Sequence, residues 1–134
     1  MQTDVLVIGA GAAGMYAAIG AARAGAQVVL VDRSLIGRGG ATVMAQMTVA
    51  AALGEEAPDH WEHHLADTLK AGRGLCEPAL SRLLCADAPE CIREMDGWGV
   101  GWARNEKHIR QVQAPGHDRP RCVYVDFVNT GPAV

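Results

Sequence analysis

At 134 residues the chain is at most one domain by the usual size prior, and its 49% hydrophobic content is enough for a core. The formal net charge of −3 gives no reason to expect a nucleic acid or an anionic membrane as a partner. Segment 5–31 is apolar, but Arg23 and its glycines argue against a transmembrane helix, so we expect no direct membrane insertion.

No basic segment with a cleavage site precedes this apolar stretch, so we expect no signal peptide. The 4 cysteines contain no CxxC pair. Without a secretion signal we expect reduced thiols, a cytoplasmic location and no metal site.

The first 32 residues carry the clearest pattern of secondary structure. Residues 5–8 are apolar and β-branched, which predicts a buried parallel strand. A glycine-rich turn at 9–14 and an alanine-rich helix to Ala24 follow, and Gly25 is placed to end the helix in a left-handed conformation. Residues 27–31 predict a second strand, with Asp32 at its carboxyl end. This order predicts a βαβ unit in an α/β fold.

The glycines of the turn have the spacing GxGxxG, and each has a physical role. Gly9 permits the tight turn, Gly11 lets the backbone approach a pyrophosphate, and Gly14 lets the helix pack closely on the strand. A pyrophosphate would then bind free N–H groups at the positive end of the helix dipole. Asp32 lies at close to the roughly 20-residue spacing expected of a carboxylate that binds a ribose hydroxyl. The pattern predicts a dinucleotide-binding site, and the alternative is a glycine turn without a ligand.

The loop at 34–40 leaves the same edge of the sheet as Asp32. Segment 41–53 predicts a close-packed loop with a short helix beside the ligand, or simple core packing. Pro58 favours a turn and Asp59 a helix N-cap, which predicts a helix over 60–71 with an inner face. That inner face consists of Trp61, Leu65, Thr68 and Leu69. His60 and His64 share one side of this helix, and we expect an exposed histidine-rich face rather than a metal site.

Further along, Pro78 favours a helix start, and Pro89 predicts the start of a separate helix through residue 95. Segments 100–103 and 109–112 predict a hairpin, 122–128 a strand, and 129–132 a helix start. His117, Arg119 and Arg121 could bind a carboxylate, but we favour an exposed cluster of loop charges.

Segment 41–46, ATVMAQ, together with the glycine motif and Asp32, resembles the flavoprotein subunit of succinate dehydrogenase and fumarate reductase, a family that includes L-aspartate oxidase. Ala18 and Gly25 extend the motif in a pattern similar to FAD-binding two-dinucleotide-fold flavoproteins. The resemblance continues through Trp61, 67–68, 88–90, 98–100, 109–111 and 130–131. It implies FAD rather than NAD, in a Rossmann-like FAD-binding (two-dinucleotide-binding) α/β fold that is incomplete and carries a helical insert.

The resemblance assigns cofactor-binding roles to three groups of residues. The FAD pyrophosphate is held by Gly9, Gly11, Ala12, Ala13 and Gly14. The adenosine ribose binds Asp32, with Arg33 and Ser34 on the adenine side. The flavin is lined by Gly39, Gly40, Ala41, Thr42, Ala45 and Gln46. Backbone N–H groups of the last set can bond to the flavin ring and tune it.

Two positions depart from the family pattern. Members of membrane complexes have a histidine bonded covalently to the flavin at the position of Ala41, so we expect non-covalent FAD here, as in L-aspartate-oxidase-like members. Met47 and Thr48 replace the family's paired glycines, which puts close backbone approach there in question.

We expect residues 1–134 to form the N-terminal part of an FAD-binding domain, with a βαβ core at 1–54 and a helical segment with short strands at 55–134. The capping domain that carries the family's substrate chemistry is absent, so no catalytic residue is assigned. The implied function is hydride transfer between FAD and a dicarboxylate, with an iron–sulfur subunit as a partner by resemblance only. The alternatives are a non-catalytic FAD-binding fragment of a truncated chain and, less favoured, an NAD-binding module.

Overall fold

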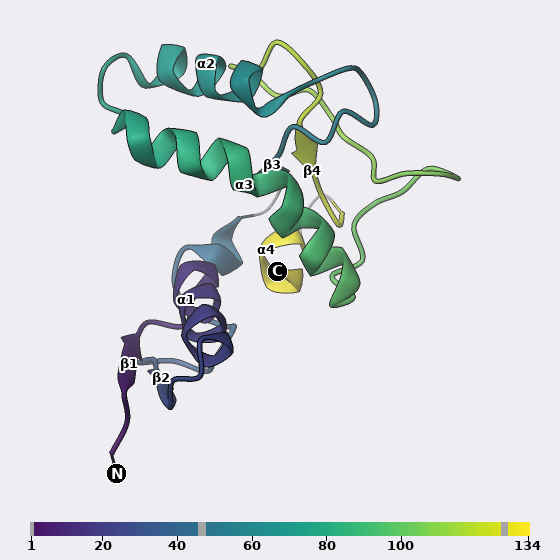
Figure 1. The fold of residues 1–134 in the computed structure, drawn as a ribbon. Coiled ribbons are helices and arrows are strands. Elements are labelled where there is room, and N and C mark those ends of the chain that lie inside the picture. Colours follow the sequence, from purple (N-terminus) through teal and green to yellow (C-terminus); the bar gives the residue numbers. More distant parts are fainter. Residues whose placement is uncertain (1, 46–47, 127–128) are drawn as a thin grey trace. The chain divides into compact units, whose positions relative to one another are not determined.

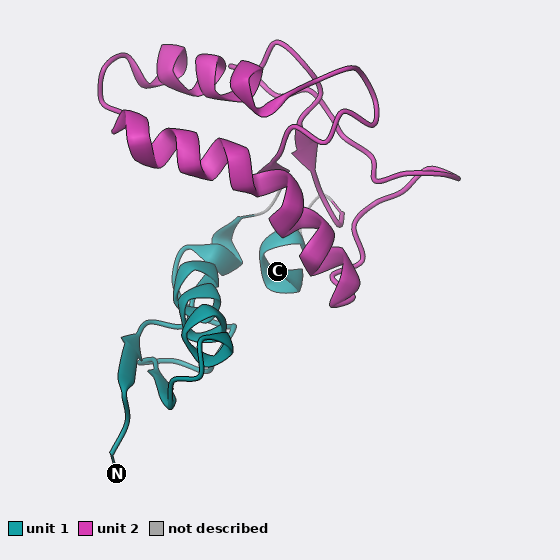
Figure 2. Cartoon of the chain, in the orientation of Figure 1, with its two compact units in different colours: residues 1–46, 128–134 teal, residues 47–127 magenta. Residues whose placement is uncertain are grey.

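The structure is a computed structural model that describes residues 2–45, 48–126 and 129–134. The chain forms two compact units (Figures 1 and 2). Unit 1 consists of residues 1–46 and 128–134, and unit 2 of residues 47–127. None of the helices in the described ranges combines the length and the apolar character that a membrane span requires.

Unit 1 begins with the predicted βαβ unit. Strand β1 (Val5–Ile8) leads into helix α1 (Ala12–Arg23), and strand β2 (Val28–Val31) returns beside β1. The two strands are parallel, in register from Val5 opposite Val28 to Ile8 opposite Val31. Gly25 adopts a φ of +89°, so the predicted left-handed end of the helix is confirmed.

The burial of β1 differs from the prediction. Leu6 is 55% exposed and Ile8 80% exposed, so the strand is not buried on both faces. Successive side chains of a strand point to opposite faces, and helix α1 packs against β1 and β2 from one side only. The apolar run therefore identified the strand correctly, but unit 1 contains no second layer over Leu6 and Ile8 among the described residues.

Two short helices complete unit 1. The 3-10 turn η1 (Thr42–Met44) lies in the segment predicted to hold a short helix, and α4 (Thr130–Ala133) confirms the predicted helix start at 129–132. They pack together, and the Gly131 N–H donates to the Ala45 carbonyl at 2.7 Å. Residues almost 90 positions apart in the sequence are thereby joined.

Unit 2 is built on helices α2 (Trp61–Gly72) and α3 (Pro78–Gly97), which pack against each other, and on a short antiparallel pair, β3 (Val49–Ala50) with β4 (Cys122–Val123). Pro78 occupies the first turn of α3 as predicted, and the Glu77 carboxylate accepts the N–H groups of Ala79 and Leu80. This cap satisfies two amides that a helix start leaves unpaired.

Several sequence predictions in unit 2 differ from the structure. Helix α3 runs through Pro89 instead of breaking there, because its packing on α2 outweighs the loss of one backbone hydrogen bond. The N-cap of α2 is His60, not Asp59. Segments 100–103 and 109–112 do not form a hairpin ladder: the described residues show only isolated bridges, Arg104 with Ile109 and Val112 with Cys122. In the predicted strand 122–128, only Cys122–Val123 is a strand within the described range.

Arg121 explains why Asp59 does not cap the helix. Its side chain is fully buried, and it donates from Nε to Asp59 at 2.6 Å, from Nη1 to Asp67 at 2.5 Å and from Nη2 to Asp118 at 2.8 Å. The predicted exposed cluster of loop charges is therefore wrong for Arg121. The guanidinium instead ties the start of α2, its middle and the loop before β4 to one point.

The carboxylates around Arg121 are stabilised in their charged form. Burial opposes ionisation of Asp67, but hydrogen bonds from the Asp118 N–H and from Arg121 outweigh it and lower the pKa of Asp67 to about 2. Burial also opposes ionisation of Asp59, and its bonds from Arg121 and the His60 N–H nevertheless hold its pKa below the ordinary value. The same two carboxylates raise the pKa of Arg121 against the effect of burial.

His64 contradicts the prediction of an exposed histidine-rich face on the first helix of unit 2. It is only 3% exposed, its ring centroid lies 5.6 Å from that of His117, and its Nδ1 has no hydrogen-bond partner among the described residues. Burial, followed by the nearby Arg121 charge, lowers the pKa of His64, so the folded state favours neutral imidazole.

We predict that Arg121→Ala destabilises unit 2 by about 3–5 kcal/mol, because it leaves buried carboxylates without a counter-charge. Arg119→Ala is the matched control: the Arg119 side chain is 30% exposed, pairs with the exposed Asp118 at 3.1 Å and lies 3.7 Å from Asp59. Because Asp59 keeps its bonds to Arg121 in this variant, the loss should cost about 0–1 kcal/mol. Urea unfolding of both variants measures the difference, and equal costs would contradict the assigned role of Arg121.

Stability should fall on acidification in two stages. His64 is neutral in the folded state, so its contribution is complete above the ordinary pKa of 6.5 and is lost as pH falls below it. Asp59 and Asp67 contribute above their ordinary pKa of 3.8, and the contribution of Asp67 is lost as pH falls toward about 2. The urea concentration at the midpoint of unfolding, determined across this pH range, measures both stages. His64→Gln should remove the first stage and leave the second, and a first stage that persists in this variant would exclude His64 as its source.

Candidate functional site

The glycine turn between β1 and α1 brings the helix unusually close to the strand end. Gly9 has a φ of +108°, a conformation that side chains rarely allow. A Cβ on Gly14 would lie 1.8 Å from the Gly9 carbonyl oxygen, and a Cβ on Gly11 would lie 3.1 Å from the Thr42 hydroxyl. Glycine at position 14 is therefore required by the contact between the helix and the turn.

The first turn of α1 presents backbone donors at this point. The Ala12 N–H donates to the Thr42 hydroxyl oxygen at 2.9 Å. In the described part of the chain no hydrogen bond involves the N–H groups of Gly11, Ala13 and Gly14 as donors. Free amides at the positive end of a helix dipole favour an anion. Because the Thr42 hydroxyl accepts from Ala12, its own O–H is left to donate to the same anion.

Asp32 stands at the carboxyl end of β2 and fixes the turn from the other side. Its Oδ2 accepts the Ala10 N–H at 2.7 Å, and its Oδ1 accepts the N–H and hydroxyl of Ser34 at 2.8 and 2.7 Å. These bonds, the one from Ala10 first, lower the pKa of Asp32 to about 2, so the group is a carboxylate at neutral pH. A carboxylate has about four acceptor positions, so Oδ2 can still accept a ribose hydroxyl.

A groove of about 380 Å³ opens beside Asp32. It is lined by Ile8, Gly9, Val31, Asp32 and Arg33. Its walls are apolar except for the carboxylate and the guanidinium, and its size is within the range of small-molecule sites. The groove thus offers an apolar wall for a planar ring and an acceptor for hydroxyl groups.

The loop after Asp32 holds the remaining predicted residues. A Cβ on Gly39 would lie 2.0 Å from the Ser34 hydroxyl, so this glycine allows the loop to fold back on itself. Gly40, Ala41 and Ala45 are exposed, with Ala41 immediately before η1. Gln46 lies outside the described residues, as does Met47.

A second cavity in unit 1 has a volume of about 150 Å³, and only some of its lining residues were assigned to the site from the sequence. The predicted Gly39 and Thr42 line it with Ala10, but so do Met15, Gly37, Val43 and residues 131–134. The Thr130–Gly131 pair was part of the resemblance, but no local pattern pointed to a role in the site. The long-range contact between α4 and η1 brings this segment to the site.

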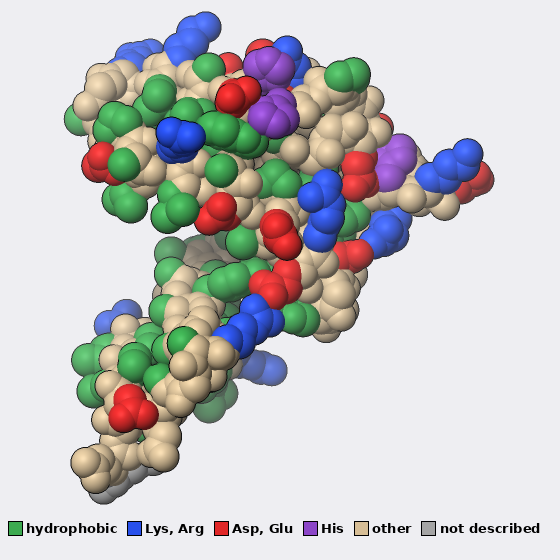
Figure 3. Space-filling view, viewed as in Figure 1, with side chains coloured by type: hydrophobic (Ala, Val, Ile, Leu, Met, Phe, Trp, Pro, Cys, Tyr) green, Lys and Arg blue, Asp and Glu red, His purple; other side chains and the backbone are tan. Residues whose placement is uncertain are grey.

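These features fit a dinucleotide better than a metal. The donor set is backbone amide and hydroxyl, which suits phosphate, and the groove offers a carboxylate to a ribose. Within the ranges that the structure describes, no group of three or more His, Cys, Asp or Glu residues could hold a metal ion. Acidic and basic side chains are interspersed on the face shown in Figure 3.

Comparisons with known proteins identify the family. The profile of the FAD binding domain family matches residues 4–134. The L-aspartate oxidase of Streptomyces coelicolor is 36% identical over 132 residues, which cover 98% of this chain and 22% of that protein. The succinate dehydrogenase flavoprotein subunit of Rickettsia bellii is 36% identical over 104 residues, 78% of this chain and 17% of that protein.

Solved structures agree with these sequence matches. The Mycobacterium smegmatis Sdh1 complex in the apo form matches with a TM-score of 0.92 and 35% identity, over 98% of this chain and 22% of that one. E. coli quinol fumarate reductase matches with a TM-score of 0.90 and 29% identity, over 99% of this chain and 23% of that one. The chain thus spans about a fifth of the length of the relatives it matches. It belongs to the FAD-binding domain family, and it corresponds to the FAD-binding domain of flavoproteins of the succinate dehydrogenase and fumarate reductase type.

Proposed function

We propose that the chain binds FAD non-covalently in unit 1 and is the N-terminal part of a Rossmann-like, two-dinucleotide-binding domain. The observation that carries this proposal is the start of α1, where the Thr42 hydroxyl and three amides that have no partner among the described residues surround the glycine turn. Together they match the charge and geometry of a pyrophosphate.

The remaining parts of the cofactor follow from this anchor. The adenosine ribose binds Asp32, and the adenine lies in the adjoining groove beside Arg33 and Ser34. The flavin end of the cofactor lies along Gly39, Gly40 and the segment 41–46. We also propose that the chain divides at residue 54 into the βαβ part, 1–54, and the helical segment with short strands, 55–134.

The absence of a covalent link is inferred from one side chain. The resemblance to membrane-complex members places the flavin-linking histidine at position 41, and the methyl group of Ala41 has no nucleophile. Ala41 is exposed and directly precedes η1, so nothing in the described residues replaces the histidine there.

We further propose that the chain serves an oxidoreductase that interconverts a C–C single and double bond in a dicarboxylate, with an iron–sulfur subunit as its partner. Bound FAD supplies hydride chemistry, and the residues of this chain bind and orient it. This proposal is supported by the names of the relatives, which are succinate dehydrogenase, quinol fumarate reductase and L-aspartate oxidase. Residues that contact the dicarboxylate are not assigned in this chain.

The direct test is to add FAD to the purified chain, remove the excess by gel filtration and record the flavin absorbance. We expect a retained flavin that acid precipitation releases into the supernatant. Flavin that stays in the precipitate would contradict the inference from Ala41. A folded chain that retains none would contradict FAD binding by the chain itself.

Gly14→Ala provides the matched variant for this test. The added Cβ would collide with the Gly9 carbonyl, so the turn must move, and FAD affinity should fall at least about tenfold, or ~1.4 kcal/mol. Gly20→Ala in the same helix meets nothing within 4 Å and should leave the affinity unchanged while stabilising the helix by up to about 1 kcal/mol. Fluorescence titration compares the two, and equal affinities would exclude the turn as the anchor.

We predict that Gly131→Ala also weakens FAD binding by about tenfold or more, although it lies outside the glycine motif. A Cβ there would lie 2.0 Å from the Thr42 carbonyl oxygen and 2.8 Å from that of Ala45, so η1 must shift and the bond from Ala12 to Thr42 must break. Hydrogen exchange of the Ala12 amide without FAD should accelerate in Gly131→Ala and in Thr42→Val. An Ala12 amide that stays protected in Gly131→Ala would show that the segment does not act through Thr42.

A further inference from the structure

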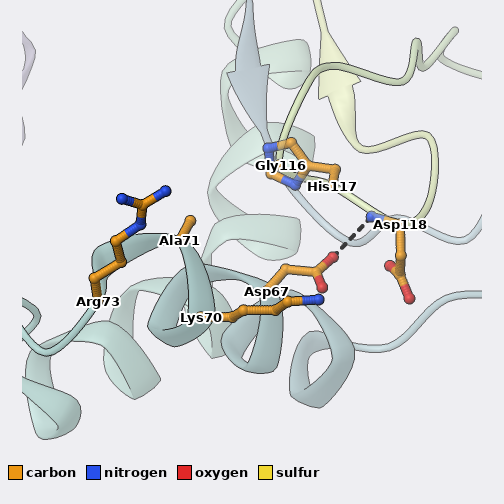
Figure 4. A pocket seen from close by; sticks show the side chains of 7 residues that line it. All are labelled: Asp67, Lys70, Ala71, Arg73, Gly116, His117 and Asp118. Carbon is orange, nitrogen blue, oxygen red and sulfur yellow. Dashed lines mark hydrogen bonds between the residues drawn. The ribbon is translucent and has the colours of Figure 1, made fainter.

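A cavity of about 600 Å³ in unit 2 has no part in the proposed FAD site. Figure 4 shows its walls: the second half of α2, with Asp67, Lys70 and Arg73, and the loop of His117 and Asp118. We call it the α2 cavity. All of its lining residues belong to unit 2, so it is defined by the packing of that unit alone.

The two acidic residues of the α2 cavity are already engaged. Asp67 accepts the Asp118 N–H at 2.9 Å, drawn as the dashed line in Figure 4, and also accepts from Arg121. Asp118 accepts from Arg119 at 3.1 Å and from Arg121 at 2.8 Å. Arg121 and Arg119 together set two positive charges against the three carboxylates of Asp59, Asp67 and Asp118. About one negative charge therefore remains in this network, and the two further cations of the cavity outweigh it.

The basic residues of the α2 cavity are free. Within the described part of the chain, Lys70 and Arg73 have no ion pair and no side-chain hydrogen bond. His117 adds an N–H donor. The Arg121 guanidinium can only donate, and its Nη1 lies 3.5 Å from His117 Nδ1, so Nδ1 accepts and the ring proton is on Nε2. Two cations and one N–H donor therefore surround the space.

The backbone of Arg73 gives an independent indication. With a φ of +48°, it is the only non-glycine with a positive φ among the described residues, and it ends α2 in the left-handed conformation. Glycine is the residue that this position normally selects, because a side chain there is strained. Glycines are present on both sides, at 72 and 74, but not at the strained position. Strain of this kind tends to be retained where a side chain has a function.

We propose that the α2 cavity binds a small dianion, a phosphate or a dicarboxylate, through Lys70, Arg73 and the Nε2–H of His117. Both ligand types present several anionic oxygens, which two separated cations and an N–H donor can bind together. The site is independent of the FAD site, so either proposal can fail without the other.

The test is a two-dimensional NMR titration of the complete 134-residue chain, with inorganic phosphate and with succinate as separate probes. It is run at about pH 8, where phosphate is mostly doubly charged, and at constant ionic strength with chloride. We expect saturable shifts for amides in 67–73 and 116–118 with at least one probe, and the probe that saturates identifies the ligand type. Absence of saturation with both probes would overturn the proposal.

Arg73→Gly separates binding from folding. It removes the cation and the strained conformation together, so affinity for the dianion should fall roughly five- to tenfold while the melting temperature stays equal or rises. Lys70→Gln should weaken binding by a similar factor. Arg93→Gln, which removes an exposed cation of α3 outside the cavity, is the matched control and should leave the affinity unchanged. Unchanged affinity in Arg73→Gly and Lys70→Gln would exclude these two side chains as ligands of the dianion. An equal loss in Arg93→Gln would show that the titration reports only general charge.

Discussion

Unit 1 depends on the close contact between the first turn of α1 and the carbonyl of Gly9. This contact is possible only without a side chain at position 14, and it places the amino end of the helix directly over the end of β1. Two side chains then hold the turn in place: Asp32 accepts the Ala10 N–H, and Thr42 accepts the Ala12 N–H. Each bond removes one donor and leaves neighbouring amides available, so the same geometry that stabilises the turn also defines the proposed anion site.

Unit 2 depends on a different kind of interaction, a buried charge. Arg121 joins Asp59, Asp67 and Asp118, which come from the start of α2, its middle and the loop before β4. A buried ion pair adds little stability relative to apolar packing, but removing one partner is costly because the other charge stays buried. The network thus makes the position of the 116–121 loop on α2 specific. It also engages both carboxylates of the α2 cavity, Asp67 and Asp118, whereas Lys70 and Arg73 have no ion pair among the described residues.

Glycine and backbone strain bear on the two proposed sites in different ways. In unit 1, glycine occurs where the backbone must come close to another group, at positions 14, 39 and 131. In unit 2, Arg73 occupies a left-handed position that glycine would occupy without strain. A ligand that binds backbone requires small residues around it, whereas a ligand that binds charge requires a side chain even where the backbone disfavours one.

The sequence by itself determined the βαβ unit, the backbone roles of Gly9 and Gly14, Pro78 at the start of α3 and the family. These depend on local periodicity, backbone conformation and motif spacing. It could not determine that Arg121 and His64 are buried. Arg121 looks like a surface residue until Asp59 and Asp67, more than 50 residues away, are in place, and the same holds for His64 and its neighbour His117. It also could not place residues 131–134 beside Thr42 or keep α3 continuous through Pro89. Those outcomes depend on packing between distant segments, and only the tertiary structure decides which of them come together.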